Sequence, residues 1–271
     1  MSPRLTSDAE IGKGHYATKQ IFCKDRLIAW SHRRRFEVGL RLARRFHGKR
    51  ILDYGCGDGT FLALLHATDT PPAESVGVEL DDLQVNDCRE RLGQRPGLRF
   101  ERIVDLDTES HRGAYDGVVC MEVLEHIVAL DAVIERLWRV LADDGTLIVS
   151  VPVETGLPLL VKQTVRRIAG WRGIGDYPGT SPYTLHECCA SVFAGRQPHL
   201  TRTAHGGSDA PFYDHKGFNW MALRERLCQR FDVQQVVASP VPWLGPHLAT
   251  QVWFVATKKR SPTSQESSWA G

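Results

Sequence analysis

The sequence lacks the patterns that mark a secreted, disulfide-bonded or membrane-spanning protein. Its seven cysteines form no CxxC pair, and only Cys188 and Cys189 are neighbours, which seldom form a disulfide with each other. The first residues read MSPRLTSDAEIGKG and contain no apolar core of a signal peptide. No apolar run approaches the roughly 20 residues that span a bilayer. We therefore expect a reduced, cytoplasmic protein.

Net charge is also nearly absent. A formal charge of +2 gives the chain no general affinity for nucleic acid. Only residues 31–50 are strongly basic, and this arginine-rich stretch is interpreted as a solvated face or as a cover for a ligand pocket. A site for a phosphate-bearing acceptor is the sharper alternative for the same stretch. The polar tail, 259–271, is expected to be disordered.

Strand-like and helix-like segments alternate along the middle of the sequence. Residues 16–47 have apolar side chains at helical spacing. After them, apolar runs that end at glycine or acidic residues predict strands, and amphipathic stretches between the runs predict helices. Such alternation implies a doubly wound, mostly parallel sheet with helices on both faces. The predicted strands are 50–55, 75–80, 98–104, 115–121, 146–152, 232–238 and 250–258, and the predicted helices between them are 60–67, 81–92, a helix from Leu130 closed by Gly145, and 217–230.

The same pattern divides the chain into parts. We predict an N-terminal helical segment at 1–47 and a sheet domain at 48–258, with an insertion at about 154–216. Open α/β sheets bind ligands beyond the carboxyl ends of their strands, so we expect the insertion to cover that edge and to select the substrate. Its amphipathic stretch, 157–171, carries apolar residues on one side and Lys162, Arg166 and Arg167 on another. It either packs on its own domain or rests on a membrane surface.

A glycine-rich turn follows the first predicted strand, in the segment ILDYGCGDGTF at 51–61. Alternate glycines let the backbone turn sharply and approach a ligand with no Cβ in the way. The spacing differs from the G-x-G-x-x-G of a dinucleotide site, and no Lys-Ser/Thr pair follows as in a phosphate loop. Asp53 suits a cationic ligand, and Glu79, at the end of the next strand, can accept hydrogen bonds from both hydroxyls of a ribose. Together these residues predict a nucleoside site.

These segments resemble the class I S-adenosylmethionine-dependent methyltransferases. The resemblance covers 48–153 well and 217–258 in outline, and its motifs are ILDYGCGDG, VGVEL, VDLD, YDGVVCMEVLEHI and LADDGTLIVSVP. It implies a seven-stranded Rossmann-like sheet with an antiparallel last strand and S-adenosyl-L-methionine as cofactor. It also implies positions for the cofactor: the methionine part against Asp53, Gly55 and Gly57, the ribose against Glu79, the adenine against Asp105 and Leu106, and the sulfonium beside Cys120 and Met121.

Three titratable residues follow the fourth predicted strand: Glu122, Glu125 and His126. If the following helix begins there, they share one face of it. With His215 they form a partial shell for Mg²⁺ or Mn²⁺. Two other interpretations stay open: a polar helix start that complements the helix dipole, or catalysis by His126 or His215 as a base, with Glu122 as a further candidate. The spacing is similar to that of ubiquinone-biosynthesis O-methyltransferases and of 2′-O-methyltransferases of small RNA.

The resemblance implies O-methylation of a small-molecule, lipid or glycan acceptor. One alternative is a metal-dependent 2′-O-methyltransferase acting on the 3′ end of RNA, which the small net charge disfavours. Another is a non-catalytic S-adenosylmethionine-binding partner subunit, which the complete set of cofactor motifs disfavours. We expect a cytoplasmic protein that contacts a membrane, if at all, peripherally through 157–171.

Overall fold

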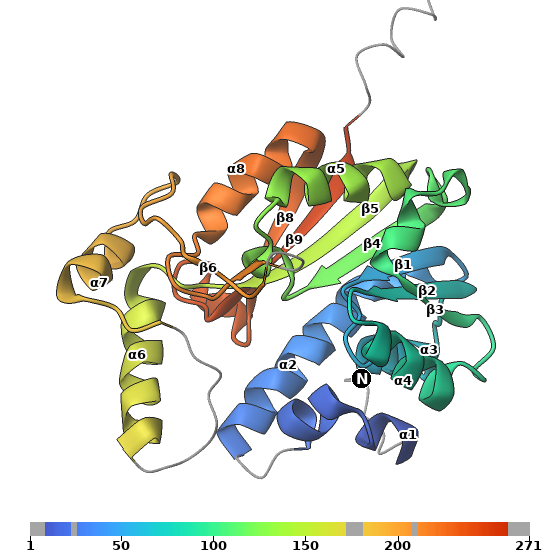
Figure 1. The fold of residues 1–271 in the computed structure, drawn as a ribbon, viewed down its shortest axis with the longest axis horizontal. Coiled ribbons are helices and arrows are strands. Elements are labelled where there is room, and N and C mark those ends of the chain that lie inside the picture. The colour runs from blue at the N-terminus through green and yellow to red at the C-terminus, as the bar shows by residue number, and fades with distance from the viewer. Residues whose placement is uncertain (1–8, 23–25, 172–180, 208–210, 260–271) are drawn as a thin grey trace, which may run out of the picture.

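A computed structural model describes residues 9–22, 26–171, 181–207 and 211–259 (Figure 1). The predicted disordered tail lies outside these ranges, except for Lys259. Within the described residues, no helix is both long and apolar enough to cross a membrane.

A central sheet of seven strands has the order β3-β2-β1-β4-β5-β9-β8, and β9 is antiparallel to both of its neighbours. The sequence prediction of a mostly parallel sheet with an antiparallel last strand is thus confirmed. The strand order reverses at β1 and β4, which is where open α/β sheets form a ligand crevice. The strands are β1 (Arg50–Tyr54), β2 (Glu74–Glu79), β3 (Leu98–Arg102), β4 (Tyr115–Met121), β5 (Leu141–Pro152), β8 (Phe231–Ser239) and β9 (Gln251–Lys258).

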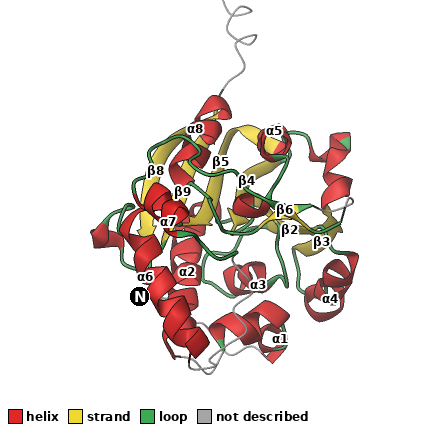
Figure 2. Cartoon of the chain, turned by 60° about the vertical axis from the view of Figure 1, so that its left-hand side comes forward, coloured by secondary structure: helices red, strands yellow, loops and turns green. Residues whose placement is uncertain are grey.

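Helices cover both faces of the sheet (Figure 2). On one face lie α5 (Leu130–Val140) and α8 (Trp220–Arg230), and on the other lie α2 (Arg26–Ala43), α3 (Thr60–His66) and α4 (Asp82–Leu92). Leu137 of α5 and Leu227 of α8 are fully buried. Burial of each such leucine stabilises the fold by roughly 1.5–3 kcal/mol.

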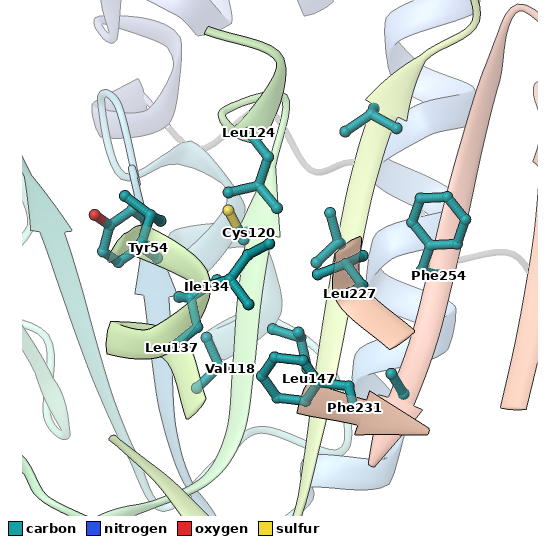
Figure 3. Close-up of a cluster of buried hydrophobic side chains, with 14 of the residues drawn as sticks. Tyr54, Val118, Cys120, Leu124, Ile134, Leu137, Leu147, Leu227, Phe231 and Phe254 are labelled. Carbon is teal, nitrogen blue, oxygen red and sulfur yellow. The ribbon is translucent and has the colours of Figure 1, made fainter. Parts of the chain in front are cut away.

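Successive side chains of β4 enter different cores because side chains alternate across a strand. Val118 and Cys120 pack under α5 and α8, whereas Val119 packs with the α2–α3–α4 layer. Figure 3 shows the sulfur of Cys120 close to Tyr54, Leu124 and Ile134. The apolar run that predicted this strand therefore fills two cores at once.

Of two local predictions, one is confirmed in part and one is wrong. Residues 16–47 are mostly helical, as predicted, but not as one α-helix: a π-helical turn (Ala17–Ile21) precedes α2, and α1 (Ala9–Gly12) lies before both. Ile11 and Ile21 are buried in the core that α2, α3 and α4 cover. Gly145 does not cap a helix, because α5 ends at Val140 and Leu141 already pairs with Tyr115 as the first residue of β5.

The segment predicted as an insertion leaves the sheet after β5 and forms α6 (Gly156–Trp171), α7 (Leu185–Val192) and a short hairpin, β6 (Ala204–His205) and β7 (Phe212–Tyr213). In Figure 1, α6 and α7 lie to the side of the sheet where β5 ends. A backbone bridge between Ile127 and Phe212 joins the hairpin to the segment after β4. The described part of 154–216, called the cap below, thereby reaches the edge of the sheet where β4 ends.

Candidate active site

The glycine turn after β1 has a backbone that only glycine adopts easily. Gly55, Gly57 and Gly59 have φ values of 74°, 55° and 72°, in the left-handed region that disfavours a side chain. A Cβ at Gly55 would lie 2.5 Å from Cγ2 of Val123. Val123 follows β4, so the turn and the acidic segment after β4 are in direct contact.

Glu79 holds this turn from the end of β2. Its Oε2 accepts a hydrogen bond from the Gly57 N–H at 3.0 Å, and its Oε1 accepts one from the Leu80 N–H at 2.7 Å. Each carboxylate oxygen has a second lone pair. Glu79 can therefore orient the turn and still accept hydrogen bonds from a bound ribose.

Asp53 lies at the carboxyl half of β1 and is 2% exposed. Burial, followed by repulsion from Glu79, raises the pKa of Asp53 to about 8. A bound cation would favour the ionised carboxylate and reverse this shift. The buried acid beside the glycine turn thus fits S-adenosylmethionine, which carries an ammonium and a sulfonium.

The segment 9–22 covers the glycine turn. Asp58 accepts the Ala17 N–H at 2.9 Å, and a Cβ at Gly14 would lie 2.4 Å from the Asp58 carboxylate. The ring of Tyr16 lies 3.1 Å from the position a Cβ would take at Gly57. The sequence indicated 31–50 as a candidate cover for the ligand pocket. The close contacts with the glycine turn come instead from the residues before that stretch. Those residues have few apolar side chains, so no sequence pattern marks them as a cover.

The remaining cofactor candidates lie in different environments. Asp105 is partly exposed, and a hydrogen bond from the Arg102 side chain lowers its pKa. Leu106 and Cys120 are fully buried in the core, so neither side chain is exposed to a ligand. Met121 packs toward the opposite core, on the side of α2 and α3.

Glu122 does not lie on a helix. It has a φ of 56°, follows the last residue of β4, and precedes a 3₁₀ turn at Leu124–His126, while the helix α5 begins only at Leu130. The helical-face interpretation of the cluster is therefore wrong. The Glu122 carboxylate accepts hydrogen bonds from Ser150 (3.1 Å) and Gln251 (2.7 Å) and lies 3.2 Å from Nη1 of Arg35.

Glu125, His126 and His215 form a group: one ligand atom from each lies within 4.8 Å of the others. Glu125 is fully buried, and neither of its carboxylate oxygens has a hydrogen-bond partner among the described residues. Burial, together with the charge of Glu122, holds the pKa of Glu125 well above its usual range. One carboxylate and two imidazoles are a suitable donor set for a divalent cation.

The two histidines are brought together across 89 positions of sequence by the β7 segment. Nδ1 of His126 donates to the Tyr213 carbonyl oxygen at 2.7 Å, so Nε2 takes no part in that bond. The centroids of the His126 and His215 rings are 4.8 Å apart. Burial lowers the pKa of His126. The neutral imidazole that this favours is the form that binds a metal or accepts a proton.

Sequence reasoning missed Arg202, which connects the two halves of this group. Its guanidinium donates to the carbonyl oxygens of Glu125 and Asp214, both at 2.5 Å, and lies over the Tyr213 ring. Burial lowers the pKa of Arg202. No local pattern marks an arginine that acts 77 residues from its partner.

Residues 28–197 match a family described as methyltransferase domain. The chain belongs to the class I S-adenosylmethionine-dependent methyltransferases. A ubiquinone biosynthesis O-methyltransferase of Psychrobacter cryohalolentis is 31% identical over 206 residues, which cover 72% of each chain. One of Psychrobacter arcticus is 30% identical over 127 residues, and that match covers 45% of this methyltransferase and 46% of the relative, less than half of its length.

A solved structure supports the same fold. The methyltransferase is similar to a putative S-adenosylmethionine-dependent methyltransferase from Listeria monocytogenes, with a TM-score of 0.51 and 17% identity. The likeness covers 82% of this chain and 99% of the other. At this identity it shows a shared fold and nothing about the substrate.

Proposed function

We propose that this methyltransferase transfers a methyl group from S-adenosylmethionine to a hydroxyl oxygen of a small-molecule acceptor. The observation that carries the proposal is the contact between the glycine turn and Val123, which lies between Glu122 and Glu125. It brings a cofactor site and a buried acid–histidine group to one edge of the sheet. The relatives named as O-methyltransferases support oxygen as the methylated atom.

Cofactor binding would depend on the carboxylates of Asp53 and Glu79 and on the glycine turn, which has no side chains in the way of a ligand. S-adenosylmethionine supplies a methyl group that its sulfonium already activates. Ionised Asp53 would balance the positive charge, and Glu79 would hold the ribose. The cover at 9–22 would exclude water, so that the protein's main contribution is alignment of the reacting groups.

The acceptor hydroxyl must lose its proton, and the group after β4 provides for this. Glu125, His126 and His215 would hold Mg²⁺ or Mn²⁺. As a Lewis acid, the cation would favour the ionised form of the acceptor hydroxyl. The buried Glu125 oxygens without hydrogen bonds support this assignment. In the alternative, His126 or His215 removes the proton alone, and Glu122 contributes at the same rim.

The acceptor itself would enter under the segment 154–216. Leu157, Leu160 and Val161 of α6 are exposed, at the spacing of one helix face. Such a face would suit a lipid-like acceptor or peripheral contact with a membrane. The side chains of Arg166 and Arg167 lie outside the described ones, so the basic side of this helix stays a prediction.

Calorimetry with S-adenosylhomocysteine tests the cofactor site. We expect binding by the full chain, weakening in Asp53→Ala and Glu79→Ala, and no change in the control Asp232→Ala, whose side chain is exposed on β8. Absence of binding by the wild type would refute the proposal.

Turnover of small-molecule acceptors that bear a hydroxyl group tests the chemistry. Transfer of label from the methyl-labelled cofactor would be measured after chelation, and again after Mg²⁺ or Mn²⁺ is restored. Recovery on metal addition supports the cation; activity that chelation leaves unchanged supports a histidine acting alone.

A further inference from the structure

A second buried carboxylate, Glu154, lies beside the histidine pair. It follows β5 by two residues and is fully buried. Nζ of Lys162 donates to Glu154 Oε1 and to the Val153 carbonyl oxygen, both at 2.9 Å. Lys162 belongs to α6, so this ion pair fastens the cap helix to the end of β5.

Glu154 also faces His215. The distance from its Oε1 to Nδ1 of His215 is 3.8 Å. This nitrogen is buried and has no hydrogen-bond partner among the described residues. A rotation of the imidazole ring would bring Nδ1 within hydrogen-bond distance of the carboxylate, and it would satisfy a buried donor that is otherwise left unpaired.

His126 shows what such a contact does. Its Nδ1 is held by the Tyr213 carbonyl oxygen, which fixes the tautomer and leaves Nε2 to act. Imidazoles that bind metals usually donate their other N–H to a carboxylate or a carbonyl oxygen, and the partner both orients the ring and increases its basicity. His126 has the carbonyl form of this arrangement, and His215 has a carboxylate in the corresponding place.

We propose that Glu154 is the positioning residue of His215, and that Lys162 holds the Glu154 carboxylate for this role. Glu154 accepts the Nδ1 proton of His215, so that Nε2 is presented to the cation. Through Lys162, the placement of α6 is coupled to the strength of the metal site. This inference rests on the proposed function, because it requires that Glu125, His126 and His215 bind a cation.

Direct measurement of Mn²⁺ binding to the full chain tests the role of Glu154. Glu154→Gln keeps the size of the side chain and removes its charge, and we expect a loss of Mn²⁺ affinity of roughly 10–100-fold. Lys162→Gln should cause a smaller loss, because Glu154 stays but is no longer held. Affinity for S-adenosylhomocysteine should stay at the wild-type value in both variants, which also shows that they fold.

Glu135→Gln is the matched control, because Glu135 forms an ion pair with Arg230 away from the histidines. It should bind Mn²⁺ like the wild type. If Glu154→Gln bound Mn²⁺ with wild-type affinity, this inference would be overturned, but the proposed metal site would stand. Absence of Mn²⁺ binding by the wild type would instead refute the metal site, and this inference with it.

The tautomer of His215 gives a second readout that a merely structural role would not change. In long-range ¹⁵N–¹H spectra of the ligand-free chain, we expect the proton on Nδ1 in the wild type and a mixture of tautomers in Glu154→Gln. The same mixture in both proteins would contradict a positioning role. If Glu154→Gln does not fold, the Mn²⁺ affinity and the spectra of Lys162→Gln decide the question.

Discussion

The two halves of the candidate active site are built in different ways. The cofactor half is local: the glycine turn, Asp53 and Glu79 come from two adjacent strands, and the Glu79 carboxylate holds the turn through the Gly57 N–H. The acceptor half is assembled from distant segments. Residues after β4 meet the β7 segment, the end of β5 and the cap, and Arg202 joins them through two carbonyl oxygens.

The two halves are therefore sensitive to different changes. The cofactor half depends on backbone conformation, so a single methyl group can disrupt it. The acceptor half depends on side chains that hold separate segments together, so its loss should leave cofactor binding intact. Substitutions in one half at a time test that separation.

The largest effect is expected from Gly55→Ala. The alanine would have to adopt a left-handed backbone, and its Cβ would lie 2.5 Å from a methyl carbon of Val123. Together these two effects should lower the free energy of unfolding by about 2–5 kcal/mol. We expect no measurable S-adenosylhomocysteine binding by calorimetry. Gly48→Ala is the control, since Gly48 also has a positive φ but no atom within 4 Å of the added Cβ; it should lose only about 1–2 kcal/mol and bind normally.

Arg202→Met should break the acceptor half alone. The variant keeps apolar packing against Tyr213 but removes the donors to the Glu125 and Asp214 carbonyl oxygens. Displacement of the reacting groups by about an ångström lowers turnover on the order of 10²-fold, while calorimetry should show unchanged S-adenosylhomocysteine affinity. Arg226→Met, which removes an exposed ion pair with Asp131, should leave both measurements unchanged. Equal losses of binding and turnover in Arg202→Met would show that the halves are not separable.

The pH dependence of stability should reveal Asp53. Its pKa is about 8 in the folded protein against 3.8 for the unperturbed group, so between these values the folded state binds more protons than the unfolded state. The free energy of unfolding contributed by Asp53 therefore falls as pH rises from about 4 to 8, by at most about 1.4 kcal/mol per pH unit. Urea unfolding of the ligand-free wild type and of Asp53→Asn over this range measures it. The difference between the two curves should change with pH; parallel curves would contradict the assignment.

Glu122→Gln should have the smallest effect. Glutamine retains a carbonyl oxygen for Ser150 and Gln251 and loses the charge that faces Arg35 and that, in addition to burial, raises the pKa of Glu125. Because Glu122 lies outside the group formed by Glu125, His126 and His215, we expect Mn²⁺ affinity to change less than about threefold, well under the 1.4 kcal/mol that a tenfold change represents. A loss of tenfold or more would restore Glu122 as a metal ligand.

Much of the cofactor half could be read from the sequence. Alternate glycines after a buried strand, and an acid at the end of the next strand, are patterns of adjacent residues, and short-range geometry decides what they do. The strand at 115–121 was predicted at its observed bounds, since its apolar run fills a core on each face. The side-chain orientations of Leu106 and Cys120 could not be read in this way, because they depend on which face of the sheet α5 covers.

The sequence alone predicts the mostly parallel sheet with its antiparallel last strand, and the glycine turn of the candidate cofactor site. The acceptor half, in contrast, follows only from tertiary contacts. The positive φ of Glu122 and its partners Arg35 and Gln251, the grouping of Glu125 with His215, and the placement of Glu154 and Arg202 all depend on contacts between segments far apart in the chain. Periodicity reports which face of an element is buried, but it carries no information on which distant side chain meets that face.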